Sequence, residues 1–249
     1  LGHQAPKPPI RMPHHVRRAR RTSATFARDD GACRRVQPVR KRHRALAEMV
    51  SMSELHGPHW FMEAAHFVPS FRHSQFISRV KDDIGHDSAR AAMRQTVIKH
   101  YYDNYGAPEL PPSWMVFETL TFGTVSQAFK NLTRQNQKPI AKAFGLDGTV
   151  LGSWLHALPY VRNLAARHQR LWNRAYTIKP IAARHQAADL QDTTRFYAQA
   201  AMIEALLRVV APGSLWDERL ADLLAQHPKV RLDRLGFPEG WQQRAVWTG

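Results

Sequence analysis

The chain has 249 residues, 43% of them hydrophobic and seven of them tryptophan, a composition that excludes an intrinsically disordered protein. Its 36 Lys and Arg against 20 Asp and Glu give a net charge of +16, which favours nucleic acid or another anionic surface as a partner. Cys33 is the only cysteine and no run of about 18 apolar residues occurs, so neither an internal disulfide nor a membrane-spanning helix is expected.

Residues 1–44 carry most of this charge, because they hold thirteen Lys and Arg against two acids, or +11 of the +16. No helical or strand period of apolar residues runs through them, and too few side chains could be buried to offset the entropy of ordering. We therefore predict a disordered basic leader over 1–44 and a helical domain over 45–249. The leader is expected either to bind nucleic acid or to be a solvated tail without a specific partner, and both interpretations stay open.

Helical patterning begins after the leader. The spacing predicts a helix over 88–105, and the proline-rich residues 107–112 predict a stiff connector. Ser113 is expected to cap a helix that Gly123 ends, and Thr124 to cap the next one. That second helix should bury four side chains: Val125, Ala128, Phe129 and Leu132. Pro139 is expected in the first turn of a short helix closed by Gly145.

The longest helix is predicted over 149–174. Six residues on it recur at spacings of three and four and form one stripe: Trp154, Leu158, Val161, Ala165, His168 and Trp172. Pro159 should kink this helix or begin a new one just before Arg162. Further helices are expected over 193–210 and 214–226, the second capped by Ser214. No strand is predicted, so the expected class is all-α.

Familiar catalytic and metal-binding motifs are absent from the sequence. It has no glycine-rich phosphate loop, no Cys-x-x-Cys pair and no Gly-x-Ser-x-Gly turn. His14-His15 and His56-Gly57-Pro58-His59 lack carboxylates or thiolates at ligand spacing, so we expect neither a metal nor a cofactor. His59 stands beside Trp60 and is predicted to be a packed side chain.

The block from Arg162 to Arg174 is the strongest candidate for chemistry. Metal-free RNA cleavage needs a base, an acid and a cation, and His168 and Arg162 are suitable groups. Two groups six residues apart on one helix differ by about 120° and about 9 Å, so a shared site requires a second copy of the chain. Three further arginines are predicted to bind RNA phosphates: Arg167, Arg170 and Arg174. The alternatives are a core histidine at 168 and a solvated helix face at 162 and 167.

Several ordered stretches of the chain form a recognisable set: His56–Phe61, Ile98–Tyr102, Pro112–Glu118, Leu120–Thr124, Ser153–His156, Arg162–Arg174 and Leu235–Trp241. Together they resemble the Abi-like family of bacterial abortive-infection proteins. The resemblance implies a HEPN-like helical bundle with additional C-terminal helices, and HEPN members are commonly dimeric, metal-independent ribonucleases with an Arg-x4–6-His motif. By this resemblance Arg162, Asn163 and His168 are the catalytic residues. The family motif usually has two adjacent histidines, and here Arg167 replaces the first.

The expected function is an anti-phage abortive-infection effector, a metal-independent endoribonuclease acting on RNA as a cytoplasmic homodimer. A companion RNA or defence protein is a further candidate partner. Three alternatives stay open: a non-catalytic RNA-binding relative, a degraded family copy that lacks part of its helical core, and a structural partner in a defence system. A cysteine-poor secreted protein is the alternative to a cytoplasmic one.

Overall fold

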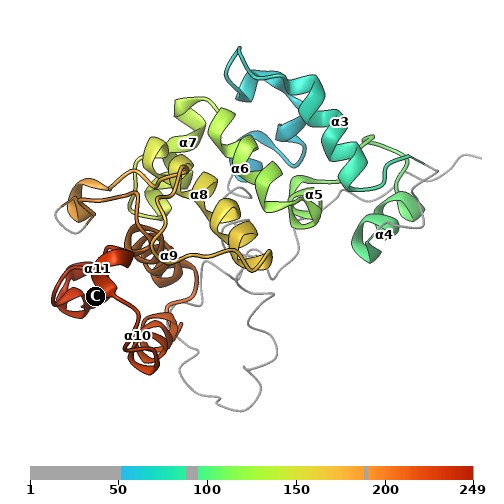
Figure 1. Ribbon diagram of the computed structural model, residues 1–249. Coiled ribbons are helices and arrows are strands. Elements are labelled where there is room, and N and C mark those ends of the chain that lie inside the picture. The colour runs from blue at the N-terminus through green and yellow to red at the C-terminus, as the bar shows by residue number, and fades with distance from the viewer. Residues whose placement is uncertain (1–51, 88–94, 188–189, 249) are drawn as a thin grey trace, which may run out of the picture.

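The computed structural model describes residues 52–87, 95–187 and 190–248 (Figure 1). Within these ranges it consists of helices and loops without a strand, and a single bridge pairs Phe67 with Leu132. The predicted all-α class is confirmed. Several predictions lie outside the described residues: the leader over 1–44, His14-His15, Cys33, and residues 88–94 of the helix expected over 88–105.

Eight longer helices are described. They are α3 (His73–Asp83), α4 (Thr96–Asn104), α5 (Ser113–Thr119), α6 (Phe122–Asn131), α7 (Arg134–Ala143), α8 (Gly148–Ala166), α9 (Phe196–Val210) and α10 (Trp216–Gln226). Shorter turns complete the order: η2 (Trp60–Met62), η3 (Ala64–His66), η5 (Arg184–Gln186), α11 (Leu232–Leu235), η6 (Trp241–Gln243) and α12 (Ala245–Thr248).

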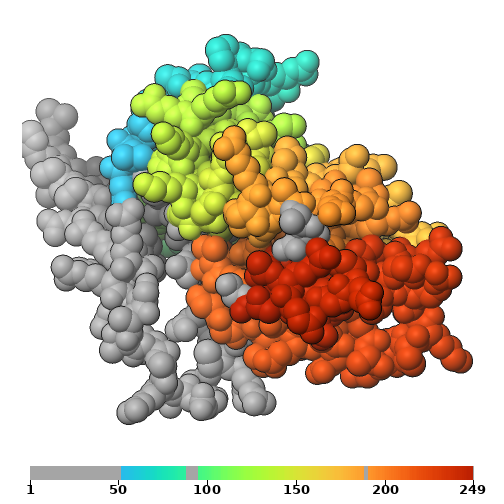
Figure 2. Space-filling model, turned by 90° about the vertical axis from the view of Figure 1, so that its left-hand side faces the viewer, coloured from blue at the N-terminus to red at the C-terminus, as the bar shows by residue number. Residues whose placement is uncertain are grey.

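Helix α8 is central and packs against α6, α7 and α9 (Figure 1). Its Trp154 is fully buried in the larger hydrophobic core, and the indole Nε1 donates to the carbonyl of Ile181 at 2.7 Å. The Ile181 N–H in turn donates to the Ser153 hydroxyl at 2.9 Å. These two bonds tie the segment after α8, hereafter the return segment (residues 167–183), back along the helix. In Figure 2 its orange atoms border the yellow-green atoms of the α7 region.

A second hydrophobic core lies in the C-terminal part, where α9, α10, α11 and α12 meet (Figure 1). Helix α9 belongs to both cores, because Met202 and Leu206 face the larger one while Tyr197 and Ala201 face the second. A helix buried on two faces needs apolar residues around most of its surface, which is the pattern of α9. The C-terminal helices are thereby attached to the rest of the molecule.

The helix starts differ from the predicted ones. Ser113 is the first residue of α5 rather than its cap, and its hydroxyl pairs with the buried Ser53 hydroxyl at 2.5 Å. Helix α6 starts earlier than expected, because the Thr121 hydroxyl accepts the Thr124 N–H at 3.2 Å, which places Gly123 inside the helix. The Ser214 cap is wrong too, since α10 begins after Leu215.

The position predicted for Pro139 was also wrong, and of the two outcomes predicted for Pro159, a kink or a new helix start, the new start is excluded. Pro139 lies in the middle of α7, on an exposed position, and not in its first turn. Helix α8 continues through Pro159 without a new start before Arg162. Other predictions are confirmed: the four residues expected inside α6 and at its end are buried, and Gly145 ends α7 with a positive φ of 67°.

Candidate functional site

Helix α8 ends at Ala166, eight residues before the predicted end. Its start is capped by Asp147, whose carboxylate accepts the Thr149 N–H at 2.7 Å. Near its end, Arg162 and Asn163 are exposed, and the guanidinium of the first donates to the amide oxygen of the second at 3.0 Å. The two predicted motif residues therefore lie together on the last turns of α8.

His168 lies past the end of the helix, in a left-handed conformation with φ 52°. Its N–H donates to the Ala165 carbonyl at 3.0 Å, and the Gln169 N–H donates to the Leu164 carbonyl at 2.9 Å. This pair of bonds defines the Schellman motif, in which the left-handed residue is usually glycine. The helical separation of 120° and 9 Å between Arg162 and His168 therefore does not apply.

Three other helix ends among the described residues have the same pair of backbone bonds. At the ends of α3, α7 and α11 the left-handed residue is Gly85, Gly145 and Gly236 respectively, with φ between 65° and 82°. A side chain in this conformation costs about 1–2 kcal/mol relative to the right-handed one, a penalty that glycine avoids. Only at α8, among these four ends, does a histidine replace the glycine.

The imidazole of His168 is exposed, so the interpretation as a core histidine is wrong. The later part of the predicted apolar stripe fails with it, because Ala165 is exposed and the Trp172 side chain is 47% exposed. The guanidinium carbon of Arg170 stands 5.8 Å from the ring centroid of Trp172, within range of a cation–π contact. An exposed indole beside arginines is a surface on which a base can stack.

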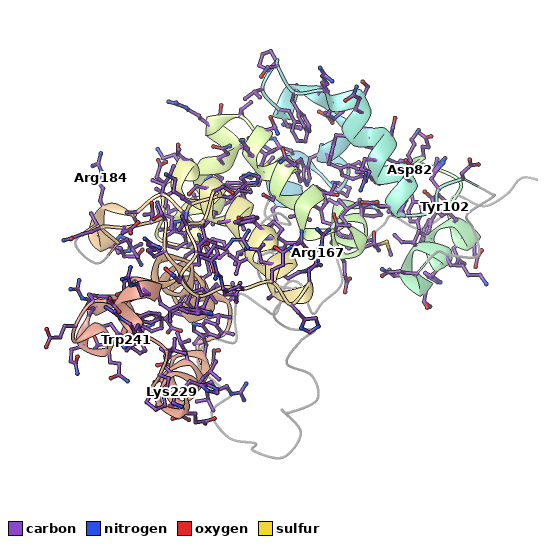
Figure 3. All side chains as sticks on the ribbon, viewed as in Figure 1. Asp82, Tyr102, Arg167, Arg184, Lys229 and Trp241 are labelled. Atoms are coloured by element: carbon purple, nitrogen blue, oxygen red, sulfur yellow. The ribbon has the colours of Figure 1, made fainter. Side chains whose placement is uncertain are left out.

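The four arginines of this region have no carboxylate partner among the described residues: Arg162, Arg167, Arg170 and Arg174 form no ion pair there. Arg167 stands at the C-terminal end of α8 (Figure 3). The guanidinium of Arg174 donates to the amide oxygen of Gln169 at 3.4 Å. Their charges are therefore available to an anionic ligand.

A small hydrophobic cluster holds the return segment against α8. Tyr176 is buried against Val161 and Leu164, and its hydroxyl donates to the Leu171 carbonyl at 3.0 Å. Burial raises the pKa of Tyr176 to about 12, although the charge of nearby Arg174 opposes the rise. The hydroxyl consequently stays protonated and keeps donating at all physiological pH values.

Asn163 also lines a hollow of about 620 Å³ between α3, α6 and α8, together with Arg72 and Tyr160. His156, one turn and a half before Arg162 on α8, lines this hollow and the neighbouring one of about 610 Å³. Sequence analysis singled out neither Arg72 nor His156 as a functional residue.

The sequence nevertheless contains a signal for the region around these two hollows. Between residues 119 and 188 the chain has ten Lys and Arg and a single acid, Asp147, although residues 45–249 as a whole carry only +5. The average over the domain conceals this local excess. A count over shorter windows would have found it.

In the described ranges no group of three or more His, Cys, Asp or Glu side chains is placed to hold a metal ion. None of the described helices has the length and apolar character needed to cross a membrane.

Comparison with known protein families assigns the chain to one of them. A family model described as Abi-like protein matches residues 40–173, more than half of the sequence. The chain belongs to the Abi-like protein family. In this Abi-like protein the match includes α8 and most of the Arg162–Arg174 block, and it stops before α9 and the C-terminal core. No match was found among curated proteins or among solved structures.

Proposed function

We propose that this Abi-like protein is a HEPN-type, metal-independent endoribonuclease with Arg162, Asn163 and His168 as its catalytic residues. Membership of the Abi-like family suggests a role in abortive-infection defence. The observation that carries the proposal is the exposure of His168 in a strained backbone conformation, beside arginines that have no carboxylate partner among the described residues. Strained residues of this kind occur preferentially at functional sites.

The proposed reaction is an attack of a ribose 2′-hydroxyl on the adjacent phosphorus. His168 removes the 2′ proton, a new oxygen–phosphorus bond forms, and the bond to the 5′-oxygen breaks. The leaving oxygen takes a proton from an acid, so the products are a 2′,3′-cyclic phosphate and a free 5′-hydroxyl. Arg162 stabilises the charge that develops on the phosphorane oxygens.

The acid in this scheme comes from a second copy of the chain. Each chain supplies one motif histidine, which cannot be base and acid at the same moment. We therefore propose a homodimer in which two α8 ends share one RNA. Arg167, Arg170 and Arg174 bind phosphates on either side of the scissile bond, as bidentate guanidinium–phosphate contacts allow.

The test is cleavage of RNA by the purified full chain in EDTA. Arg162→Ala and His168→Ala are each expected to abolish cleavage. Their matched controls are Arg219→Ala and His227→Ala, which remove an exposed arginine and an exposed histidine far along the chain. The site assignment is wrong if cleavage survives the first two substitutions or depends on added magnesium.

A non-catalytic RNA-binding protein is the second candidate function. It is favoured by Arg167, which replaces the first histidine of the family motif and cannot exchange a proton near neutral pH. The two candidates share their RNA contacts and differ in turnover. RNA binding without cleavage in the assay above would favour the second.

A further inference from the structure

Three adjoining hollows lie along one face of α8. The hollow that Asn163 lines shares His156 and Ile178 with a second hollow of about 610 Å³. The second shares Arg134 and Gly148, among others, with a third of about 610 Å³ at the end of α7. These three hollows are hereafter the α8 groove. Its walls come from α3, α6, α7, α8 and the return segment.

The α8 groove is lined by cations at intervals. Arg72 lies in the first hollow, Lys130, Arg134 and Lys179 in the second, and Lys138 and Lys142 in the third. Within the described part of the chain, neither Arg72, Lys130 nor Lys179 forms an ion pair. A wall of uncompensated cations repels other cations and attracts a polyanion.

Acidic side chains are nearly absent from the α8 groove. Among the described lining residues the one carboxylate is Asp147, in the third hollow. That carboxylate is engaged as the cap of α8: the Thr149 N–H holds the pKa of Asp147 below its usual range, and the charge of Arg134 contributes. The groove as a whole therefore presents a positive surface.

Apolar and aromatic side chains lie between the cations. Phe71, Tyr160 and Ile178 line the first hollow. The Tyr160 ring packs edge-on against Tyr176, and its hydroxyl accepts a hydrogen bond from the Thr177 hydroxyl at 3.2 Å, so the ring is fixed in place. A cationic track with fixed aromatic rings is the arrangement that binds single-stranded nucleic acid, by phosphate contacts and base stacking.

We propose that the α8 groove binds single-stranded RNA and leads it to the end of α8. Phosphates contact Lys130, Arg134 and Lys179 in the second hollow, the strand passes His156, and bases stack in the first hollow beside Tyr160. It then reaches Asn163, which belongs both to the groove and to the proposed catalytic motif. This inference rests on the proposed function, because it supplies the path of that enzyme's substrate.

The test measures binding of a fluorescein-labelled single-stranded oligoribonucleotide by anisotropy. The full chain carries His168→Ala throughout, so that cleavage does not interfere. The groove variant adds Lys130→Gln, Arg134→Gln and Lys179→Gln. The matched control adds Lys99→Gln, Arg219→Gln and Lys229→Gln, which remove the same charge from exposed positions outside the groove. Lys229 lies among the C-terminal helices (Figure 3).

The groove variant should bind RNA at least about tenfold more weakly than its parent, and its salt slope should fall by about 2, since each single-strand phosphate contact contributes about 0.7. The control should change affinity by less than about threefold. Equal losses in both variants would show a general charge effect and overturn the proposal. Unchanged binding by the groove variant would overturn it as well, and would leave the groove to a different partner.

A second measurement locates the RNA directly. Photocrosslinking with a 4-thiouridine oligonucleotide should label peptides from residues 119–188, Tyr160 and His156 among them. Crosslinks confined to 1–44 would contradict the groove as the binding path. Both measurements are independent of turnover: an inactive chain that binds RNA in the groove contradicts the proposed function alone, whereas an active chain without groove binding contradicts this inference alone.

Discussion

His168 has the left-handed backbone conformation that glycine has at the ends of α3, α7 and α11. The cost falls on folding, whereas the benefit is an imidazole held in solvent at the end of α8. Strained residues of this kind cluster at functional sites, which agrees with the proposed role of His168. Stability and activity should therefore respond in opposite directions to substitution.

We expect His168→Gly to raise the free energy of unfolding by about 1 kcal/mol, because glycine removes the left-handed penalty. The same variant should lose RNA cleavage. Urea unfolding measures the first effect and the EDTA cleavage assay the second. Gly145→His is the matched control, since Gly145 occupies the same position at α7 with open space around it, and it should lose about 1 kcal/mol. A less stable His168→Gly protein would show that the imidazole makes stabilising contacts.

Arg167 gives a second prediction at this scale. An arginine can bind phosphate but cannot transfer a proton. Arg167→His should therefore raise the rate of RNA cleavage, by up to the 10²–10⁴-fold that a general acid or base typically contributes. Affinity should stay equal or fall slightly. A flat rate in a protein that already cleaves RNA would mean that His168 suffices, and Arg167→Lys controls for the charge.

The histidines near the start of the described chain respond to acid. Burial lowers the pKa of His59, and burial together with the facing His56 lowers that of His66. The rings of His56 and His66 lie 4.2 Å apart. A histidine whose pKa is lower in the folded state binds fewer protons there than in the unfolded state. The free energy of unfolding of the protein therefore decreases as pH falls below about 6.5.

The urea concentration at the midpoint of unfolding should accordingly be lower at pH 5.5 than at pH 7.5. In His66→Gln this decrease in the urea midpoint should be smaller, because position 66 can no longer bind a proton that favours the unfolded state. The change in midpoint with pH is the measured quantity, so a general loss of stability does not affect the comparison. His227→Gln, at an exposed position after α10, should leave the pH dependence as it is in the parent. An identical fall in His66→Gln and parent would contradict the prediction.

At the scale of elements, the return segment determines where α8 ends. Leu171 and Tyr176 pack onto Val161 and Leu164, which requires the chain to turn back immediately after Ala166. Arg167, His168 and Arg170 are exposed at this turn as a consequence. The site is therefore supported by a contact between residues about fifteen positions apart, and that contact can be weakened without touching a motif residue.

We predict that Tyr176→Phe destabilises the protein by about 1 kcal/mol, the usual net value of one hydrogen bond, because the Leu171 carbonyl loses its donor. Cleavage should fall more than RNA affinity, since the loop that carries His168 becomes less well positioned while its charge is unchanged. The separate measurements are kcat and the anisotropy Kd. Tyr160→Phe is the control on the adjoining ring. It keeps an aromatic ring at position 160 and removes only the hydroxyl that accepts the hydrogen bond from Thr177. Equal losses of kcat and affinity would argue against a positioning role.

At the scale of the whole molecule, positive charge is gathered on one stretch of chain. Residues 119–188 hold ten of the 23 Lys and Arg found after residue 44, and only one acid. The stretch includes α6, α7, α8 and the return segment, which line the α8 groove. In the proposed mechanism each chain has one motif histidine, so we expect two chains to pair and complete the site.

A mixing experiment tests that pairing. Wild-type chain equilibrated with a tenfold excess of His168→Ala chain should lose most of its activity, because nearly every wild-type chain is then paired with an inactive one. RNA is kept in excess over total protein, so that competition for substrate is negligible. Full activity in the mixture would show that each chain has a complete site, and light scattering that detects only monomer would agree with that result.

The sequence by itself determined the helical class, the family and the candidate residues. Helical periodicity is a local property, and the inward residues of α6 could therefore be predicted from spacing alone. Tertiary structure decided where α8 ends, since neither Gly nor Asn marks that position and a contact with Tyr176 turns the chain there. It also decided the α8 groove. Arg72, Lys130 and Lys179 come from segments far apart in the chain, and only packing around α8 brings them to adjoining hollows.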